Sequence, residues 1–152
     1  MVSLNKVDFA FLEDSKYNTK TEKFSLNGYK TFGKCVHVYD GDTVHVILKL
    51  PNSDTCYKWI IRLMGIDTPE IKSKNAIEKQ KAKESQAFLA KLILNKIIYI
   101  ECLEFDKYGR LLGNLYLDMN EPKSLNQLMV DNGFAKAYDG GHKEGWGDLS
   151  SE

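Results

Sequence analysis

The chain has 152 residues, of which 43% are hydrophobic and 28% charged, as expected for one globular domain with a substantial core. Its formal net charge is zero and its pI is about 6.8, so binding to a polyanion would have to depend on local patches. No apolar run is long enough for a transmembrane helix, and the first residues lack the apolar region of a signal peptide. The three cysteines are an odd number without a CxxC motif, which argues against zinc and favours an intracellular, reducing compartment.

Composition changes along the chain suggest three regions. Residues 1–30 are a mixed polar extension that we expect to be loosely packed or partly disordered. Residues 31–138 carry the regular patterns of a compact domain. Residues 139–152 form a Gly-rich tail without periodicity.

The compact region predicts five strands and two helices. Segments 34–39, 43–50 and 57–64 alternate apolar and polar residues around short turns, which is typical of an antiparallel meander. The rest predicts a helix over 76–95, a hairpin over 97–117 and a short helix over 124–132, which Ser124 caps. This order predicts an α+β fold: a five-stranded, OB-type antiparallel β-barrel with two helices packed on it. Such barrels bind oligonucleotides, but the fold alone does not settle function.

Charged residues gather at the ends of the predicted strands. Arg62 lies among apolar residues of the third strand, where a buried guanidinium needs an anionic partner. Asp42 leaves the first turn and Asp67 ends the third strand, so a meander can bring both to one mouth of the barrel. Two carboxylates with the Thr68 carbonyl form an all-oxygen site, which suits Ca²⁺ or Mg²⁺.

Each of these motifs also has an ordinary structural explanation. The Asp-Gly turn at 40–42 is common in hairpins. Pro69 stiffens the loop that carries Glu70, but a tight turn with a surface ion pair has the same sequence. Arg110 could join Arg62 in clamping a phosphate, or it could belong to an exposed charged turn. The combination is more informative than any single motif.

Together these motifs resemble those of the staphylococcal nuclease family. The matching segments occur in the family's order within residues 30–138. They are Asp-Gly-Asp-Thr-Val at 40–44, Arg62, Asp-Thr-Pro-Glu at 67–70 and Asp-Lys-Tyr-Gly-Arg at 106–110. The resemblance implies a Ca²⁺-dependent phosphodiesterase that cuts DNA and RNA and leaves 3′-phosphate ends, with Mg²⁺ or Mn²⁺ as possible substitutes. We expect no membrane partner and take a monomer as the default.

The resemblance also implies roles for individual residues. The metal ligands would be Asp42, Asp67 and the Thr68 carbonyl, with Asp40 behind them. The catalytic residues would be Arg62, Arg110 and Glu70, the last activating water. Lys107 and Tyr108 resemble contacts to a terminal phosphate, and Tyr138 resembles a tyrosine that stacks on the nucleotide.

Several features depart from the secreted bacterial enzymes of the family. The hairpin before Asp106 is shorter, the segment before Tyr138 is one residue shorter, the long C-terminal helix is missing, and the chain is neutral rather than strongly basic. The alternative function is therefore a catalytically silent OB-type module that binds nucleic acid without cutting it. Degenerate domains of that kind lack the metal aspartates or the arginines, and this chain has them all, which favours the enzyme.

Overall fold

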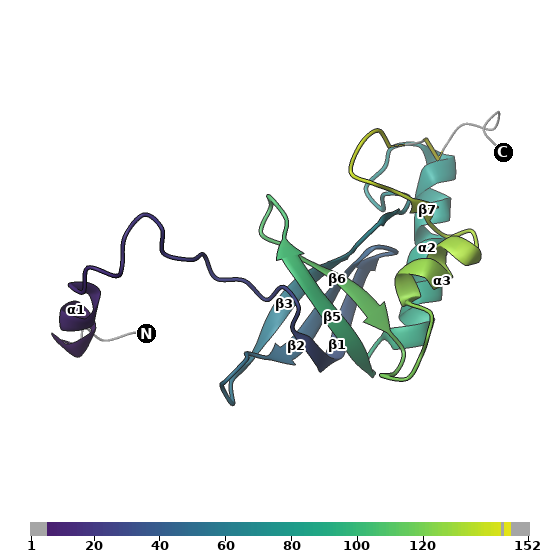
Figure 1. The fold of residues 1–152 in the computed structure, drawn as a ribbon. Coiled ribbons are helices and arrows are strands. Elements are labelled where there is room, and N and C mark those ends of the chain that lie inside the picture. Colours follow the sequence, from purple (N-terminus) through teal and green to yellow (C-terminus); the bar gives the residue numbers. More distant parts are fainter. Residues whose placement is uncertain (1–5, 144, 147–152) are drawn as a thin grey trace.

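The computed structural model describes residues 6–143, 145 and 146; the ends of the predicted extension and tail, 1–5 and 147–152, lie outside the described residues. The first helix, α1 (Lys6–Leu12), lies apart from the rest at the end of an extended segment (Figure 1). Leu26 is already buried in the main core, so the end of the predicted extension contributes to it. In the described part of the chain, no helix is long and apolar enough to cross a membrane.

Five strands close into a barrel in the order β1-β2-β3-β6-β5. Four seams of the barrel are antiparallel, and the seam between β3 and β6 is parallel. Strand direction cannot alternate at every seam when an odd number of strands closes on itself, so one parallel seam is unavoidable. The predicted five-stranded, OB-type α+β fold is confirmed. The strands are β1 (Lys30–Asp40), β2 (Thr43–Lys49), β3 (Cys56–Leu63), β5 (Ile97–Phe105) and β6 (Leu111–Tyr116).

The core of the molecule fills the interior of this barrel. In β2, Val44, Val46 and Leu48 are buried in alternation with more exposed residues, which is the period of a strand with one face inward. Ile61 of β3 and Ile100 of β5 are also fully buried. Burying an aliphatic side chain of this size contributes about 1.5–3 kcal/mol, so the inward-facing residues stabilise the closed barrel.

Two helices, α2 (Ala76–Ile93) and α3 (Leu125–Asp131), lie on the same side of the barrel (Figure 1). Each begins at a polar cap, because Asn75 and Ser124 accept the backbone N–H of the third residue that follows them. Gln86 of α2 donates its amide to the Val38 and Tyr39 carbonyl oxygens, both at 3.0 Å, which fastens the helix to β1.

A second, two-stranded sheet joins the end of the chain to the end of the barrel. β4 (Ile66–Asp67) follows a turn at Gly65, and β7 (Lys136–Ala137) follows α3. The two strands, β4 and β7, pair antiparallel. The Tyr138 N–H donates to the Gly65 carbonyl oxygen at 2.8 Å. The sequence analysis did not anticipate this pairing, which brings the last part of the described chain beside Asp67.

A buried amide, Asn126, ties α3 to the barrel. It is 4% exposed, and its nitrogen donates to the carbonyl oxygens of Met64 at 2.8 Å and Gly113 at 3.1 Å. Its oxygen accepts the Leu115 N–H at 3.1 Å. Because Met64 lies directly before the turn into β4, the same side chain fixes the approach to Asp67.

We predict that Asn126→Ala lowers the free energy of unfolding by about 2 kcal/mol or more, because it leaves buried backbone groups without partners. Urea denaturation measures this loss. The control is Asn132→Ala, since Asn132 is exposed and its side chain donates to the Leu128 carbonyl oxygen of its own helix. Equal urea midpoints for the two variants would contradict the role assigned to Asn126.

Candidate active site

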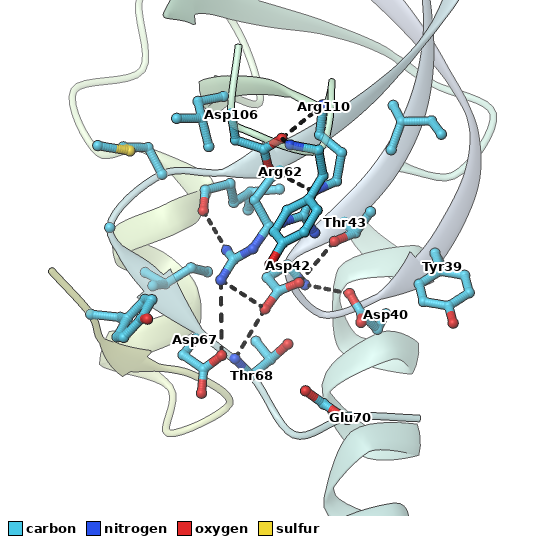
Figure 2. A pocket seen from close by; sticks show the side chains of 18 of the residues that line it. Tyr39, Asp40, Asp42, Thr43, Arg62, Asp67, Thr68, Glu70, Asp106 and Arg110 are labelled. Carbon is cyan, nitrogen blue, oxygen red and sulfur yellow. Dashed lines mark hydrogen bonds and ion pairs between the residues drawn. The ribbon is translucent and has the colours of Figure 1, made fainter. Parts of the chain in front are cut away.

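One cavity of about 890 Å³ collects the residues that the sequence analysis singled out (Figure 2). It opens where the β1–β2 turn, the loop after β3 and the hairpin turn between β5 and β6 meet. All ten predicted site residues line it: Asp40, Asp42, Arg62, Asp67, Thr68, Glu70, Lys107, Tyr108, Arg110 and Tyr138. The fold therefore brings together charges that are far apart in the sequence.

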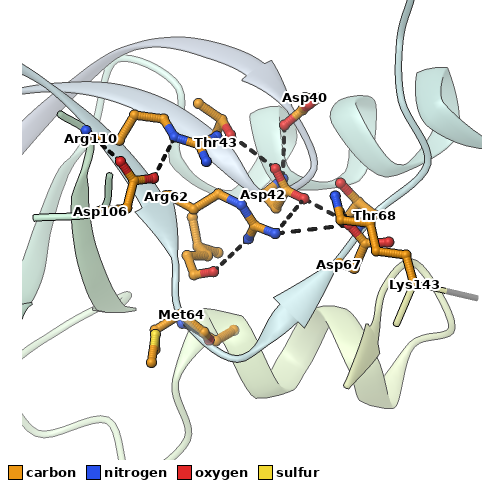
Figure 3. A network of polar contacts seen from close by, with 12 residues as sticks. Asp40, Asp42, Thr43, Arg62, Met64, Asp67, Thr68, Asp106, Arg110 and Lys143 are labelled. Carbon is orange, nitrogen blue, oxygen red and sulfur yellow. Dashed lines mark hydrogen bonds and ion pairs between the residues drawn. The ribbon is translucent and has the colours of Figure 1, made fainter. Parts of the chain in front are cut away.

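Arg62 lies at the centre of the polar network and is 9% exposed (Figure 3). Its Nη2 atom is 3.4 Å from Asp42 Oδ2 and 3.8 Å from Asp67 Oδ1. Its Nη1 atom donates to the Leu63 carbonyl oxygen at 2.7 Å. The buried guanidinium thus has the anionic partners that were expected from the sequence. Contacts at both Nη1 and Nη2 fix its orientation.

Asp42 connects the β1–β2 turn to the loop after β4. Its Oδ1 accepts the Thr43 hydroxyl at 2.9 Å, and its Oδ2 accepts the Thr68 N–H at 3.2 Å. Its own N–H donates to Asp40 Oδ1 at 3.1 Å. Burial, together with the nearby Asp42 carboxylate, raises the pKa of Asp40 to about 7. Ionising both of these buried carboxyl groups therefore costs free energy.

Gly41 allows this turn to pack closely against its neighbours. A Cβ at this position would lie 2.8 Å from the Ser85 Cβ of α2 and 2.9 Å from the Thr68 Cγ2. Both distances are shorter than van der Waals contact. A residue without a side chain is needed here so that Asp40 and Asp42 can reach the loop that carries Asp67.

Asp106 organises the hairpin turn that carries Arg110. Its Oδ1 accepts the N–H groups of Tyr108 and Arg110, both at 2.9 Å, and its Oδ2 lies 2.7 Å from Arg110 Nε. Partial burial raises the pKa of Asp106, but hydrogen bonds from Arg110 and Tyr108 outweigh it and hold that pKa below its ordinary value. The sequence analysis gave Asp106 no role of its own. The available signal was an aspartate that starts a turn ending in Gly-Arg.

The remaining predicted residues lie at the rim of the cavity. Glu70, Lys107 and Tyr108 are exposed, and Lys107 Nζ is 5.2 Å from the Tyr108 ring centroid. The Tyr138 hydroxyl donates to the Gly141 carbonyl oxygen at 3.0 Å. Glu70, Lys107 and Tyr108 are therefore open to a molecule that enters the cavity, whereas Tyr138 is half-buried and Lys143 Nζ lies 5.5 Å from its ring centroid.

Two residues of the C-terminal segment reach Asp67, and the sequence analysis assigned neither. Lys143 Nζ lies 3.1 Å from Asp67 Oδ1, and Trp146 Nε1 lies 3.5 Å from Asp67 Oδ2. Trp146 is 8% exposed. A large aromatic residue in an otherwise Gly-rich tail was the available signal, because tryptophan supplies far more packing area than its neighbours there.

The oxygen atoms around Asp42 and Asp67 could hold a hard cation. Across the described ranges, no group of three or more His, Cys, Asp and Glu side chains is arranged to hold a metal. The Thr68 hydroxyl, however, is buried, and no hydrogen-bond partner for it occurs in the described structure. Two carboxylates with Thr68 oxygens fit a cation such as Ca²⁺, whose remaining positions water or a phosphate would fill.

Comparison with known proteins identifies the family of this chain. The profile described as staphylococcal nuclease homologue matches residues 60–146, which run from β3 to Trp146. The chain belongs to this family. An uncharacterized protein of Methanocaldococcus jannaschii is 31% identical over 87% of this chain and 74% of its own length. The family includes proteins named for nuclease activity, so membership supports a nuclease.

Two such named relatives match a shorter stretch. An uncharacterized endonuclease of Escherichia coli O157:H7 is 32% identical over 70% of this chain, and a micrococcal nuclease of Shigella flexneri is 32% identical over the same share. The alignments cover 61% and 58% of these two relatives, so the chain matches about three-fifths of their length.

We predict that Gly41→Ala lowers the free energy of unfolding by about 1–3 kcal/mol, because the added methyl group forces Ser85 and Thr68 away from the turn. Thermal unfolding without nucleic acid measures the effect. Gly145→Ala is the matched control, since a Cβ there meets no atom within 4 Å. If both variants melt at the wild-type temperature, the close packing of the turn is not what requires glycine.

Proposed function

We propose that this protein is a Ca²⁺-dependent phosphodiesterase that hydrolyses DNA and RNA and leaves 3′-phosphate ends, with Mg²⁺ or Mn²⁺ as possible substitutes. The observation that carries the proposal is a single cavity lined by Arg62, Arg110, Glu70, Asp42 and Asp67. Membership of the nuclease family supports the same reaction class.

A phosphodiester is anionic, so the site must first neutralise charge. A cation held by Asp42, Asp67 and the Thr68 carbonyl would supply positive charge beside the phosphate. Arg62 would bind a phosphate oxygen from a position that Leu63 and the two aspartates already fix. Donors held in place before the reaction lose little energy to reorganisation as charge builds in the transition state.

Arg110 would complete the clamp, since it lines the same cavity as Arg62. Asp106 holds its Nε atom at 2.7 Å, which leaves the rest of the guanidinium group to bind the phosphate. Lys107 and Tyr108, on the same turn, would contact a terminal phosphate. Tyr138, at the far rim, would stack on the base of the bound nucleotide.

Glu70 would orient and deprotonate the attacking water. It is an exposed carboxylate on the cavity lining, directly after the rigid Thr68–Pro69 segment. Attack in line with the 5′ oxygen would expel that oxygen and leave the phosphate on the 3′ side. Because no 2′-hydroxyl takes part, the same groups would serve DNA and RNA.

We predict that the protein cuts single-stranded DNA with Ca²⁺ and that a chelator abolishes the cleavage. Glu70→Gln should reduce turnover far more than binding, because it removes the proton acceptor while keeping the shape of the side chain. Gel assays of cleavage beside fluorescence anisotropy of a labelled oligonucleotide separate the two effects. Saturable binding without cleavage would contradict the proposed nuclease activity and favour the catalytically silent binding module.

We predict that Arg110→Ala lowers kcat by about 10²–10³, as loss of one preorganised donor does. Arg110 is half-buried, so this variant should fold, whereas Arg62→Ala also removes the ion-pair partner of the buried Asp42 carboxylate. Lys58→Ala is the control, because Lys58 is an exposed cation of β3 that does not line the cavity. Wild-type kcat in Arg110→Ala would rule out the clamp.

A further inference from the structure

The C-terminal segment brings a lysine onto one carboxylate of the proposed metal site. Lys143 Nζ lies 3.1 Å from Asp67 Oδ1, the oxygen that also faces Arg62 (Figure 3). The Asp67 side chain is 8% exposed, whereas that of Lys143 is 49% exposed. A cation that is half in water therefore neutralises a carboxylate that is almost wholly buried.

Contacts on both sides hold Lys143 in this position. We call residues 139–143, 145 and 146 the C-terminal strap. Before Lys143, the Tyr138 hydroxyl bonds to the Gly141 carbonyl oxygen at 3.0 Å. After it, Trp146 is buried, and Lys136 Nζ lies 4.5 Å from the Trp146 ring and 2.8 Å from the Gly145 carbonyl oxygen. These contacts fasten the strap to β7, the strand paired with Asp67.

The buried carboxylates of Asp42 and Asp67 explain why a second cation is needed beside Arg62. Asp42 and Asp67 are both buried and both approach Arg62, so one guanidinium faces two carboxylates. A second positive charge is required to balance them in a low-dielectric corner. Lys143 supplies it, and a divalent cation bound to the same two carboxylates would make it redundant.

We propose that Lys143 is an exchangeable counter-charge of the metal site: it pairs with Asp67 when no divalent cation is bound, and Ca²⁺ displaces its ammonium group on binding. The inference rests on the metal site of the proposed function. A lysine suits this role because its ammonium group is strongly hydrated and its stem is flexible, so it leaves for solvent at little cost. The strap thereby lowers the affinity of the site for Ca²⁺.

Calorimetric titration of the whole chain with Ca²⁺, without nucleic acid, tests this directly. Lys143→Gln should lower the Kd for Ca²⁺ by about two- to fivefold, the scale of a half-exposed ion pair. Lys143→Arg keeps the charge and should not lower the Kd. Lys72→Gln removes another cation of the same cavity and should leave it unchanged, because no contact between Lys72 and Asp67 occurs in the described structure. An unchanged or higher Kd for Lys143→Gln, or an equal decrease for Lys72→Gln, would overturn the proposal.

Thermal unfolding separates exchange from a merely structural role. Without divalent cations Lys143→Gln should melt below the wild type, because Asp67 loses its counter-charge. With saturating Ca²⁺ the difference should disappear, since the ion replaces the lysine. The same difference in both conditions would identify a static ion pair and reject the exchange.

These measurements also separate the inference from the nuclease itself. Neither uses a substrate, so Ca²⁺ binding with the expected Lys143→Gln effect supports the inference even if the protein cuts nothing. If neither the wild type nor Lys143→Gln binds Ca²⁺, the metal site and the inference both fail.

Discussion

The site depends on one buried guanidinium. Arg62 is held among apolar residues of β3 by Asp42, Asp67 and the Leu63 carbonyl oxygen. Removing one partner from a buried ion pair typically costs 3–5 kcal/mol, because the remaining charge stays uncompensated in the interior. This interaction therefore ties the β1–β2 turn to β4, and the geometry of the cavity follows from it. In the proposed function, the group that is needed for stability is also a group that binds the phosphate.

Closure of the barrel explains how the second arginine reaches the first. The parallel seam pairs Ile61 of β3 with Leu111 of β6, and Arg62 with Leu112. Arg110 directly precedes β6, so it arrives at the same end of the barrel as Arg62. The odd number of strands thus has a structural consequence, because the parallel seam brings two cations from distant parts of the chain to one end of the barrel. Asp106 then sets the orientation of Arg110 within its turn.

The cavity gathers many charged side chains in a chain whose formal net charge is zero. Among the described residues, five cations and six carboxylates line the cavity, so its charges nearly balance, as they do in the whole chain. The cations are Arg62, Lys72, Lys107, Arg110 and Lys143, and the carboxylates are Asp40, Asp42, Asp67, Glu70, Asp106 and Asp139. The described part of the tail is irregular and brings Lys143 and Trp146 beside Asp67. In the inference drawn above, Lys143 of the tail neutralises a carboxylate of the proposed metal site and so lowers the affinity of that site for Ca²⁺.

The amino-acid sequence by itself determined the barrel strands, the two helices on the barrel and ten of the residues that line the cavity. Alternation in β2, the Ser124 cap and the order of the charged motifs are local patterns, and local backbone geometry fixes what they form. Only the tertiary structure decided the pairing of β4 with β7 and the contacts of Lys143 and Trp146 with Asp67. Strands of two residues have no measurable period, and a Gly-rich tail has none either. Their positions depend on the path of the chain around the closed barrel, which no local pattern records.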